Sequence, residues 1–304
     1  MYLERFVLPD AEREAALVKA RMAYNGGPLP YIDNSYPCSV FPDKGLTEIN
    51  FDRITILYGG NGSGKSTLLN LIARRLQLDR ISPFNSSELF DSYTAACSYE
   101  TGYDEEGRPL RIPVGSRIVT SDDVFDYMLT VRTNNEEISE NIEEARSGWR
   151  ALKYGETVKL ESMDDYEKLR LQVLSRSKSV SRRKFIRRTV GTEARLKSNG
   201  ETALTYFRKK LKSDTLYCLD EPENSLSPIL QLELKELLEE LTRYCGCQLI
   251  LATHSPFLLS MRGARIYDLD DPPVIIKSWY ELENVRIYFD FFYKNRCLFL
   301  NKTD

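Results

Sequence analysis

The chain has 304 residues, of which 42% are hydrophobic, and its formal net charge is -3. This length and composition suit one large domain or two small ones with a sizeable core. No run approaches the eighteen or so apolar residues that a membrane span needs, and the first residues lack the layout of a signal peptide. We therefore expect a soluble protein with a cytoplasmic location. The six cysteines are scattered, so neither a disulfide framework nor a zinc site is indicated.

In chain order, residues 1–58 carry short β-rich stretches between turn residues. The segment 46–58 alternates and then becomes continuously apolar, which predicts an edge strand followed by a buried parallel strand. Further buried strands are expected at 117–120, 215–219 and 248–253, and helices separate them, the clearest at 228–244. This order favours an α/β fold whose core sheet is mostly parallel, with an antiparallel β part at the N-terminus.

The apolar run at 54–58 leads directly into a glycine-rich loop that matches G-x-x-x-x-G-K-[ST]. Its glycines let backbone N–H groups turn inward around phosphate oxygens, Lys65 can reach the terminal phosphates, and the Ser66 hydroxyl can ligate Mg²⁺. The following helix adds the partial positive charge of its N-terminus. The sequence thus predicts a P-loop that binds a nucleotide through Gly59, Gly60, Asn61, Gly62, Ser63, Gly64, Lys65, Ser66 and Thr67.

Residues 122–195 are charged and helix-forming, with few strand signals. They predict a helical insertion, a lid within a single domain that spans residues 1–304. From Lys168 to Thr192 there are nine Lys or Arg residues and no Asp or Glu. Two interpretations are open: a solvated or phosphate-facing helix, or a basic face that contacts nucleic acid. The residues of that face are Arg182, Arg183, Lys184, Arg187 and Arg188.

Two motifs follow the insertion. Ser198, Asn199, Gly200 and Glu201 precede a helical stretch; alone they indicate a turn that caps a helix, with a hydroxyl and backbone N–H groups suited to an anion. The strand at 215–219 ends on two carboxylates, Asp220 and Glu221. Because parallel sheets bind ligands at the carboxyl ends of their strands, Asp220 suits Mg²⁺, and Glu221 suits a general base acting on water.

His254 is the only histidine of the chain and directly follows the strand predicted at 248–253. A lone histidine is usually incidental. Its place at a strand's carboxyl end, 33 residues after Glu221, favours a contact with a nucleotide's γ-phosphate instead. A neutral imidazole can bridge phosphate, water and a carboxylate base.

The order of these motifs resembles the ATP-binding-cassette (ABC) ATPases, and residues 220–228 and 253–259 are similar to the stand-alone SMC-like and RecF-like group. The resemblance covers residues 46–262. It implies a P-loop NTPase fold of the ABC type, with ATP and Mg²⁺ as cofactors and a head-to-tail homodimer. In such a dimer, Ser198 and Gly200 of one copy close on the ATP of the other, Glu221 activates water, and His254 holds the γ-phosphate.

Two departures from the family pattern concern the loop after 117–120 and the adenine site. The family commonly has a glutamine in that loop, whereas this chain has Ser121, Asp122 and Asp123. Asp122 can replace it as a metal contact or cap the following helix. Tyr36 and Phe41 are the candidates for stacking on adenine, and core packing is the alternative for both.

Three functions remain open on the sequence alone. The first is a soluble ATPase that couples hydrolysis to a nucleic-acid or partner-protein task, such as genome maintenance or defence against mobile DNA. The second is the ATPase subunit of a membrane transporter, and the third is a non-catalytic module that only senses ATP. The aromatic residues of 279–299 are expected to close a core, and a docking helix is the alternative.

Overall fold

The computed structural model describes residues 1–24, 34–133 and 198–300, together with 149, 153–154, 172–173 and 175–176. It divides into two compact units, one formed by Met1–Val124 and Gly200–Asp304 and the other by Phe125–Asn199. The lid at 122–195 within a single domain stays a prediction. Its basic face lies outside the described residues: Arg182, Arg183, Lys184, Arg187 and Arg188.

In the part of the first unit that the structure describes, the core sheet has six strands in the order β5-β6-β7-β3-β8-β9. Neighbouring strands are parallel except for the last pair, β8 and β9. This arrangement confirms the predicted α/β fold with a mostly parallel core sheet. The strands are β3 (Ile54–Tyr58), β5 (Arg117–Thr120), β6 (Leu216–Asp220), β7 (Gln248–Ala252), β8 (Arg265–Asp268) and β9 (Ile275–Ile276).

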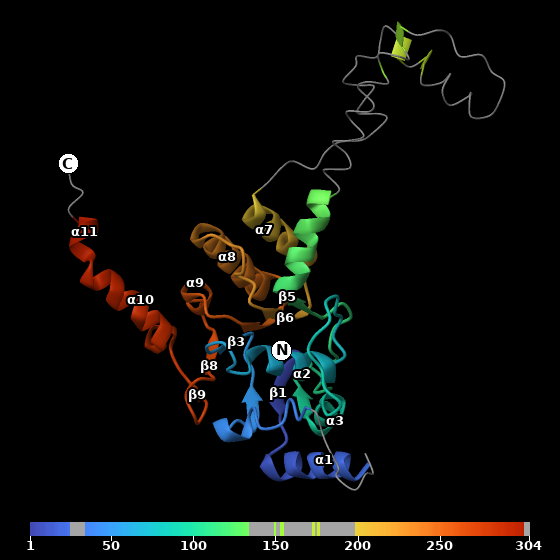
Figure 1. Cartoon of the computed structure of the whole chain (residues 1–304), viewed down its shortest axis with the longest axis vertical. Coiled ribbons are helices and arrows are strands. Elements are labelled where there is room, and N and C mark those ends of the chain that lie inside the picture. Colours follow the sequence, from blue (N-terminus) through green and yellow to red (C-terminus); the bar gives the residue numbers. More distant parts are fainter. Residues whose placement is uncertain are drawn as a thin grey trace, which may run out of the picture. The chain divides into compact units, whose positions relative to one another are not determined.

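Every residue of β3 and β7 is buried, because helices cover both faces of the core sheet. Figure 1 shows α2 on one side, and α7, α8 and α9 on the other. The helix predicted at 228–244 is confirmed as α8. The bounds are α2 (Lys65–Arg75), α7 (Asn199–Lys210), α8 (Pro228–Tyr244) and α9 (Pro256–Leu259).

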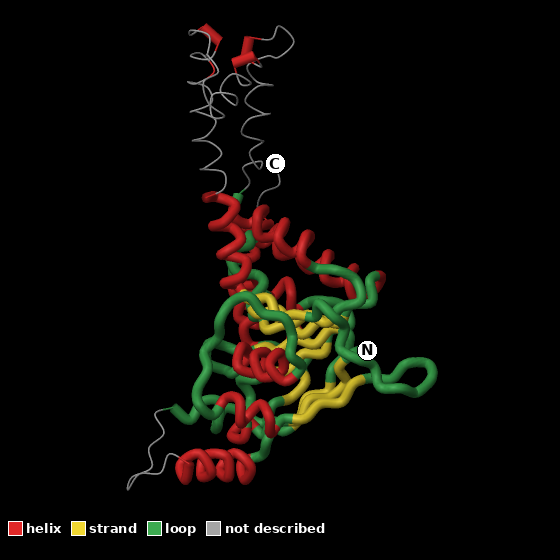
Figure 2. Tube along the Cα trace, turned by 90° about the vertical axis from the view of Figure 1, so that its right-hand side faces the viewer, coloured by secondary structure: helices red, strands yellow, loops and turns green. Residues whose placement is uncertain are grey.

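A small antiparallel sheet of order β2-β1-β4 lies beside the core sheet and confirms the predicted N-terminal β part (Figure 2). Its inward side chains Leu3, Phe6 and Ile49 are fully buried. Helix α3 packs against both α1 and α2. The elements are β1 (Leu3–Val7), α1 (Ala11–Tyr24), η1 (Pro42–Lys44), β2 (Glu48–Asn50), α3 (Phe90–Ala96) and β4 (Ser98–Thr101).

The register of the parallel strands aligns their carboxyl ends. Leu57 and Asp220 both pair with Ala252, and Thr120 pairs with Asp220. The four residues form one row across the sheet, so the loops that follow them emerge at a single edge. Those loops carry the glycines of the predicted phosphate loop, the two predicted carboxylates and the histidine.

The C-terminal segment forms η2 (Trp279–Glu281), α10 (Glu283–Lys294) and α11 (Arg296–Leu300). Figure 1 shows α10 leading away from the core. The expectation that its aromatic residues close a core is wrong, since they are between 47% and 60% exposed: Tyr280, Tyr288, Phe289, Phe291, Phe292 and Tyr293. Only Val285 of α10 is buried. No helix in the described part is long and apolar enough to cross a membrane.

The buried side chain of Gln248 joins the two sheets. Its Oε1 accepts hydrogen bonds from the backbone N–H groups of Tyr2 and Leu3, and its Nε2 donates to the Leu3 carbonyl. We expect Gln248→Leu to lower the free energy of unfolding by on the order of 3 kcal/mol, because it leaves buried backbone groups without partners. Urea denaturation measures the loss. Gln77→Leu, at an exposed amide, is the control, and an equal small change in both variants would contradict this role.

Candidate nucleotide-binding site

The predicted phosphate loop lies between β3 and α2, so it joins a buried strand to a helix N-terminus. Gly64 is the residue before α2 and has φ +98°, and a Cβ there would lie 2.9 Å from Val40 Cγ1. Only glycine fits this position without strain. The N-terminus of α2 is thereby brought to the loop, as a phosphate site requires. Asn61 and Gly62 are exposed at its tip.

The Lys65 ammonium is buried and held by the loop itself. It donates to the carbonyl oxygens of Gly59 at 2.7 Å and Gly60 at 2.9 Å. On the other side, the Gly60 N–H donates to Asp270 Oδ2 at 2.7 Å. Asp270 was not indicated by the sequence, because it follows β8, 210 residues away.

Lys44 is a second cation at the loop that the sequence did not indicate. Its ammonium donates to the Ser63 carbonyl at 2.7 Å and to the Leu269 carbonyl at 2.6 Å. Burial lowers the pKa of Lys44, with a smaller opposing effect from neighbouring carboxylates. Lys44 therefore fastens the phosphate loop to the end of β8.

Ser66 and Asp220, the predicted magnesium ligands, meet at the sheet edge, where Ser66 Oγ donates to Asp220 Oδ1 at 3.0 Å. Burial raises the pKa of Asp220 to about 6; the nearby Glu221 carboxylate adds to the rise, and the Ser66 hydroxyl opposes it. A cation at this position would favour the ionised carboxylate. Hydroxyl and carboxylate oxygens fit Mg²⁺, which takes few protein ligands and completes its shell with phosphates and water.

Among the described residues, no group of three or more His, Cys, Asp or Glu side chains could hold a metal ion by itself. A Mg²⁺ ion held by Ser66 and Asp220 would therefore take its remaining ligands from phosphate oxygens and water.

Glu221 begins the turn after β6 in a left-handed conformation, with φ +47°. Its N–H donates to the Ala252 carbonyl at 2.9 Å, and its Oε2 accepts from Asn224 Nδ2 at 3.1 Å. The predicted base thus has a side-chain partner and a fixed backbone. His254 Nδ1 lies 3.9 Å from Glu221 Oε1, so the predicted base and the histidine face each other.

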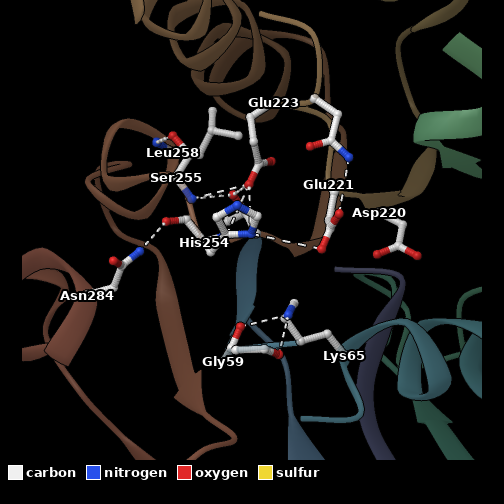
Figure 3. Close-up of polar contacts among 12 residues, drawn as sticks. Gly59, Lys65, Asp220, Glu221, Glu223, His254, Ser255, Leu258 and Asn284 are labelled. Atoms are coloured by element: carbon white, nitrogen blue, oxygen red, sulfur yellow. Dashed lines mark hydrogen bonds and ion pairs between the residues drawn. The ribbon is translucent and has the colours of Figure 1, made fainter. Parts of the chain in front are cut away.

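Glu223 is a further site residue that sequence reasoning missed. Its side chain is 5% exposed, and its Oε1 accepts from Thr253 Oγ1 at 2.6 Å, the His254 N–H at 3.0 Å and the Ser255 N–H at 3.2 Å. Figure 3 shows its carboxylate above the histidine, opposite the phosphate loop. Three donors on one buried oxygen fix the loop after β7. Its place among the acidic residues after β6 was the only signal in the sequence.

A cavity of about 1130 Å³ opens beside Ser66, Thr67 and Asp220. Tyr36 and Phe84 line it, and the Tyr36 hydroxyl donates to Thr67 Oγ1 at 3.1 Å. Phe41 is fully buried in the core, so its candidacy as the adenine-stacking residue is wrong. Tyr36 remains a candidate for stacking on adenine, and Phe84 is a second candidate, because both line this cavity.

The two aspartates after β5 have different surroundings. Asp123 is buried, and its carboxylate accepts from the N–H groups of Thr120 at 2.8 Å and Ser82 at 3.0 Å. Asp123 therefore caps the N-terminus of the helix over 121–133. Asp122 is exposed and lines the cavity with Ser66 and Asp220, which leaves it on the side expected of a metal contact.

The predicted anion motif is divided between the two units. Gly200 and Glu201 lie in the first turn of α7, where a Cβ on Gly200 would come within 2.5 Å of Leu230 Cδ1 on α8. Ser198 and Asn199 belong to the other unit. The structure therefore brings together Lys65, Ser66, Asp220, Glu221 and His254, and places Gly200 against α8.

A glycine-rich loop before a helix, with carboxylates and a histidine on neighbouring parallel strand ends, defines a P-loop nucleotide-binding protein. Comparisons with known proteins agree. Residues 46–224 match the sequence profile of the family described as "ABC transporter". Because this match covers more than half of the chain, the chain belongs to that family, and it is an ABC-type ATPase domain. Residues 201–260 also match the profile described as "AAA domain, putative AbiEii toxin, Type IV TA system".

Several solved structures are similar to this chain, whereas no curated protein matches it. The SMC head domain from Thermotoga maritima is 14% identical, with 91% of this chain and 99% of that chain covered and a TM-score of 0.37. A dimeric post-hydrolysis ATP-binding cassette bound to ADP and Pi is 15% identical, with 73% and 85% covered and a TM-score of 0.32. A nucleotide-free cassette from an ABC transporter is 18% identical, with 73% and 79% covered and a TM-score of 0.33.

The role of Glu223 can be tested with two substitutions. Glu223→Ala leaves the three donors without their acceptor, so we expect the free energy of unfolding to fall by on the order of 3 kcal/mol. Glu223→Gln keeps an oxygen in place and should cost less than about 1 kcal/mol. Urea denaturation measures both. Equal losses in the two variants would show that the shared hydrogen bonds are not what Glu223 contributes.

Proposed function

We propose that this protein hydrolyses ATP to ADP and phosphate with Mg²⁺ at the site described above. The observation that carries the proposal is the convergence of Lys65, Ser66, Asp220, Glu221 and His254 at one edge of the parallel sheet, beside the N-terminus of α2. These side chains supply the chemical groups that phosphoryl transfer to water requires: a cation for the phosphates, oxygen ligands for Mg²⁺ and a carboxylate base.

ATP binding is assigned to the loop from Gly59 to Thr67. Its backbone N–H groups and the α2 terminus would hold the phosphates, and Lys65 would neutralise charge on the terminal ones. Ser66 and Asp220 would hold Mg²⁺, which, when bound, neutralises charge that develops on the transferred phosphoryl group. The cavity lined by Tyr36 and Phe84 has room for the nucleoside.

Glu221 is assigned as the general base that takes a proton from the attacking water. His254 is assigned to the γ-phosphate, as the neighbour of Glu221 across 3.9 Å. Both groups stand on short loops directly after buried strands, so their backbones are well held. Such positioning lowers the entropic part of the barrier.

The site is proposed to be completed by a second copy of the chain. Support comes from Ser198, Asn199, Gly200 and Glu201, which have the chemistry of an anion site at a helix N-terminus. In the family that the chain resembles, such a motif lies against the partner's ATP. ATP binding would close this head-to-tail dimer and hydrolysis would open it, as a population shift driven by the ligand. The SMC-like and RecF-like character of the motifs favours a stand-alone cytoplasmic protein.

Replacing the base tests the catalytic assignment. Glu221→Gln should lower ATP turnover by about 10²–10⁴-fold, because general base catalysis contributes about that much, while ATP binding remains. Phosphate release and ATP titration measure the two properties. Glu236→Gln, on the exposed side of α8, is the matched control. With ATP, the Glu221→Gln protein should elute as a dimer.

The possible outcomes separate the candidate functions. Turnover that is unchanged in Glu221→Gln would mean that Glu221 is not the base. A wild-type protein that binds ATP and shows no turnover would instead be a non-catalytic sensor.

Nucleic acid is the proposed partner of the basic segment in the insertion, with a partner protein as the alternative. The support for a nucleic-acid partner is the segment from Lys168 to Thr192, which has nine Lys or Arg residues and no Asp or Glu. Reversing the charge at Arg182, Arg183 and Arg187 should weaken DNA binding at least about tenfold at low salt and abolish any DNA-stimulated turnover, because phosphate contacts dominate such affinity. Reversal at exposed Arg13, Lys19 and Lys294 is the control. Equal DNA binding by the wild-type protein and both sets of variants would show that this segment is not the DNA-binding surface.

An ATPase subunit of a membrane transporter is the second candidate, because the matching family profile is that of ABC transporters. The absence of the loop glutamine after β5 argues against it. Co-purification with a membrane protein would favour it, and a homodimer that stays in solution without detergent would argue for the stand-alone ATPase.

A further inference from the structure

The backbone of His254 is hydrogen-bonded on both sides of its Cα by side chains from other parts of the chain. Its N–H donates to Glu223 Oε1 at 3.0 Å, and its carbonyl accepts from Asn284 Nδ2 at 3.2 Å. Figure 3 shows Asn284 on the side of the histidine that faces away from Glu221. Because both ends of this residue are tied, the direction of its imidazole depends on Asn284 as well as on Glu223.

Asn284 also contacts the strand that precedes the phosphate loop. Its backbone N–H donates to the Tyr58 hydroxyl at 3.1 Å, and Tyr58 is the last residue of β3, directly before Gly59. The first turn of α10 therefore bridges the carboxyl ends of β7 and β3. These are the strands that present the histidine and the phosphate loop.

The same turn borders a cavity beside the predicted phosphate loop. A cavity of about 390 Å³ is lined by Gly59, Gly60 and Asn61 of the loop, and by His254, Asn284 and Ile287. The anchor of the turn is apolar, since Leu282 is fully buried and Val285 is 8% exposed. Beyond Val285 the helix is exposed, so its position relative to the site depends on this short anchor and on the contacts of Asn284.

We propose that Asn284 is a positioning residue for ATP hydrolysis, through which the C-terminal helix sets the orientation of His254. The inference rests on the proposed function, in which His254 contacts the γ-phosphate. Asn284 does not touch the reacting atoms in this assignment; it acts through the backbone of the histidine. Displacement of α10 would remove the hydrogen bonds of Asn284 to the His254 carbonyl and to the Tyr58 hydroxyl, whereas the contacts of Lys65 and of Ser66 with Asp220 do not involve α10.

Asn284→Leu tests the proposal without adding charge near the phosphates. It removes the amide donor and keeps the backbone N–H that binds Tyr58. We expect kcat to fall about tenfold, because loss of one hydrogen bond and a misdirected side chain change a barrier by about this amount, and the Kd for ATP to stay the same. Asn284→Gln, which keeps an amide donor, should retain more of the activity.

Asn295→Leu is the matched control at the other end of α10. The Asn295 amide also donates to a backbone carbonyl, that of Phe291 at 2.8 Å, but far along the exposed helix from His254. This variant should leave kcat unchanged. Unfolding by urea in all variants separates a loss of activity from a loss of fold.

A readout that does not depend on hydrolysis is available because His254 is the only histidine of the chain. In protein labelled with ¹³C,¹⁵N-histidine and purified without a polyhistidine tag, the Cε1–H group of this imidazole gives one ¹³C–¹H signal by NMR. We expect this signal to move in Asn284→Leu and to stay in place in Asn295→Leu. A signal that does not move in Asn284→Leu overturns the proposal.

A double substitution separates an effect of Asn284 through His254 from an effect on the rest of the site. In a His254→Ala background, Asn284→Leu should cause no further loss of the remaining turnover, since there is no imidazole to position; an equal loss in both backgrounds overturns the proposal. If the wild-type protein shows no turnover at all, the proposed function fails by itself. The imidazole signal then decides whether Asn284 positions the histidine.

Discussion

The parallel pairing of β5, β6, β7 and β3 is the constraint on which the site depends. Because Thr120, Asp220, Ala252 and Leu57 share one row, the residues that follow each strand are delivered to the same edge within two positions of that row. Groups that are far apart in the sequence thus become neighbours without any contact between their own side chains being needed to assemble them. A slip of a single strand by one residue would move its loop and turn its side chains to the opposite face, so the same register that buries the apolar core also aligns the polar groups.

The pairing of the strands does not by itself fix the loop that carries His254. The buried carboxylate of Glu223 holds this loop through hydrogen bonds. One oxygen of Glu223 accepts from three donors at the start of the loop after β7, which are the Thr253 hydroxyl and the backbone N–H groups of His254 and Ser255. The register of the strands therefore determines which residues come together, and Glu223 determines the backbone path of the loop after β7. Asn224 does the equivalent for Glu221 by donating to its carboxylate. The predicted base and the histidine are both supported by the turn after β6, which makes that turn the organising segment of the site.

The features that could be predicted from the sequence are those formed by residues close together in the chain. The phosphate loop is one contiguous motif, and the buried strands at 54–58, 117–120 and 248–252 are short apolar runs, so the pattern of nearby residues was sufficient. Glu223, Lys44 and Asn284 were missed because their contacts join residues 19 to 225 positions apart, and no spacing rule links a glutamate to a loop thirty residues later. Phe41 and the aromatic residues of α10 were misjudged for the same reason. Whether a ring is buried depends on which elements cover it, and α10 leaves the core after its first turn.

The carboxylates of the turn after β6 also explain why this edge is suited to a cation. Asp220, Glu221 and Glu223 lie within four residues, and burial together with the neighbouring charge of Glu221 raises the pKa of Asp220 to about 6. The carboxylate of Asp220 therefore holds its charge less favourably than an aspartate in water, and a divalent cation beside it would offset that loss. The positive charge of Lys65 opposes this rise in the pKa of Asp220, but the Lys65 ammonium is held by the carbonyl groups of its own loop. A ligand that brings both Mg²⁺ and phosphate would satisfy both sets of groups in the proposed site: the cation would lie against the carboxylate of Asp220, and the phosphate against Lys65 and the N-terminus of α2. Under the proposed function, binding of such a ligand would stabilise this edge of the sheet, because a ligand that binds only the folded protein stabilises it.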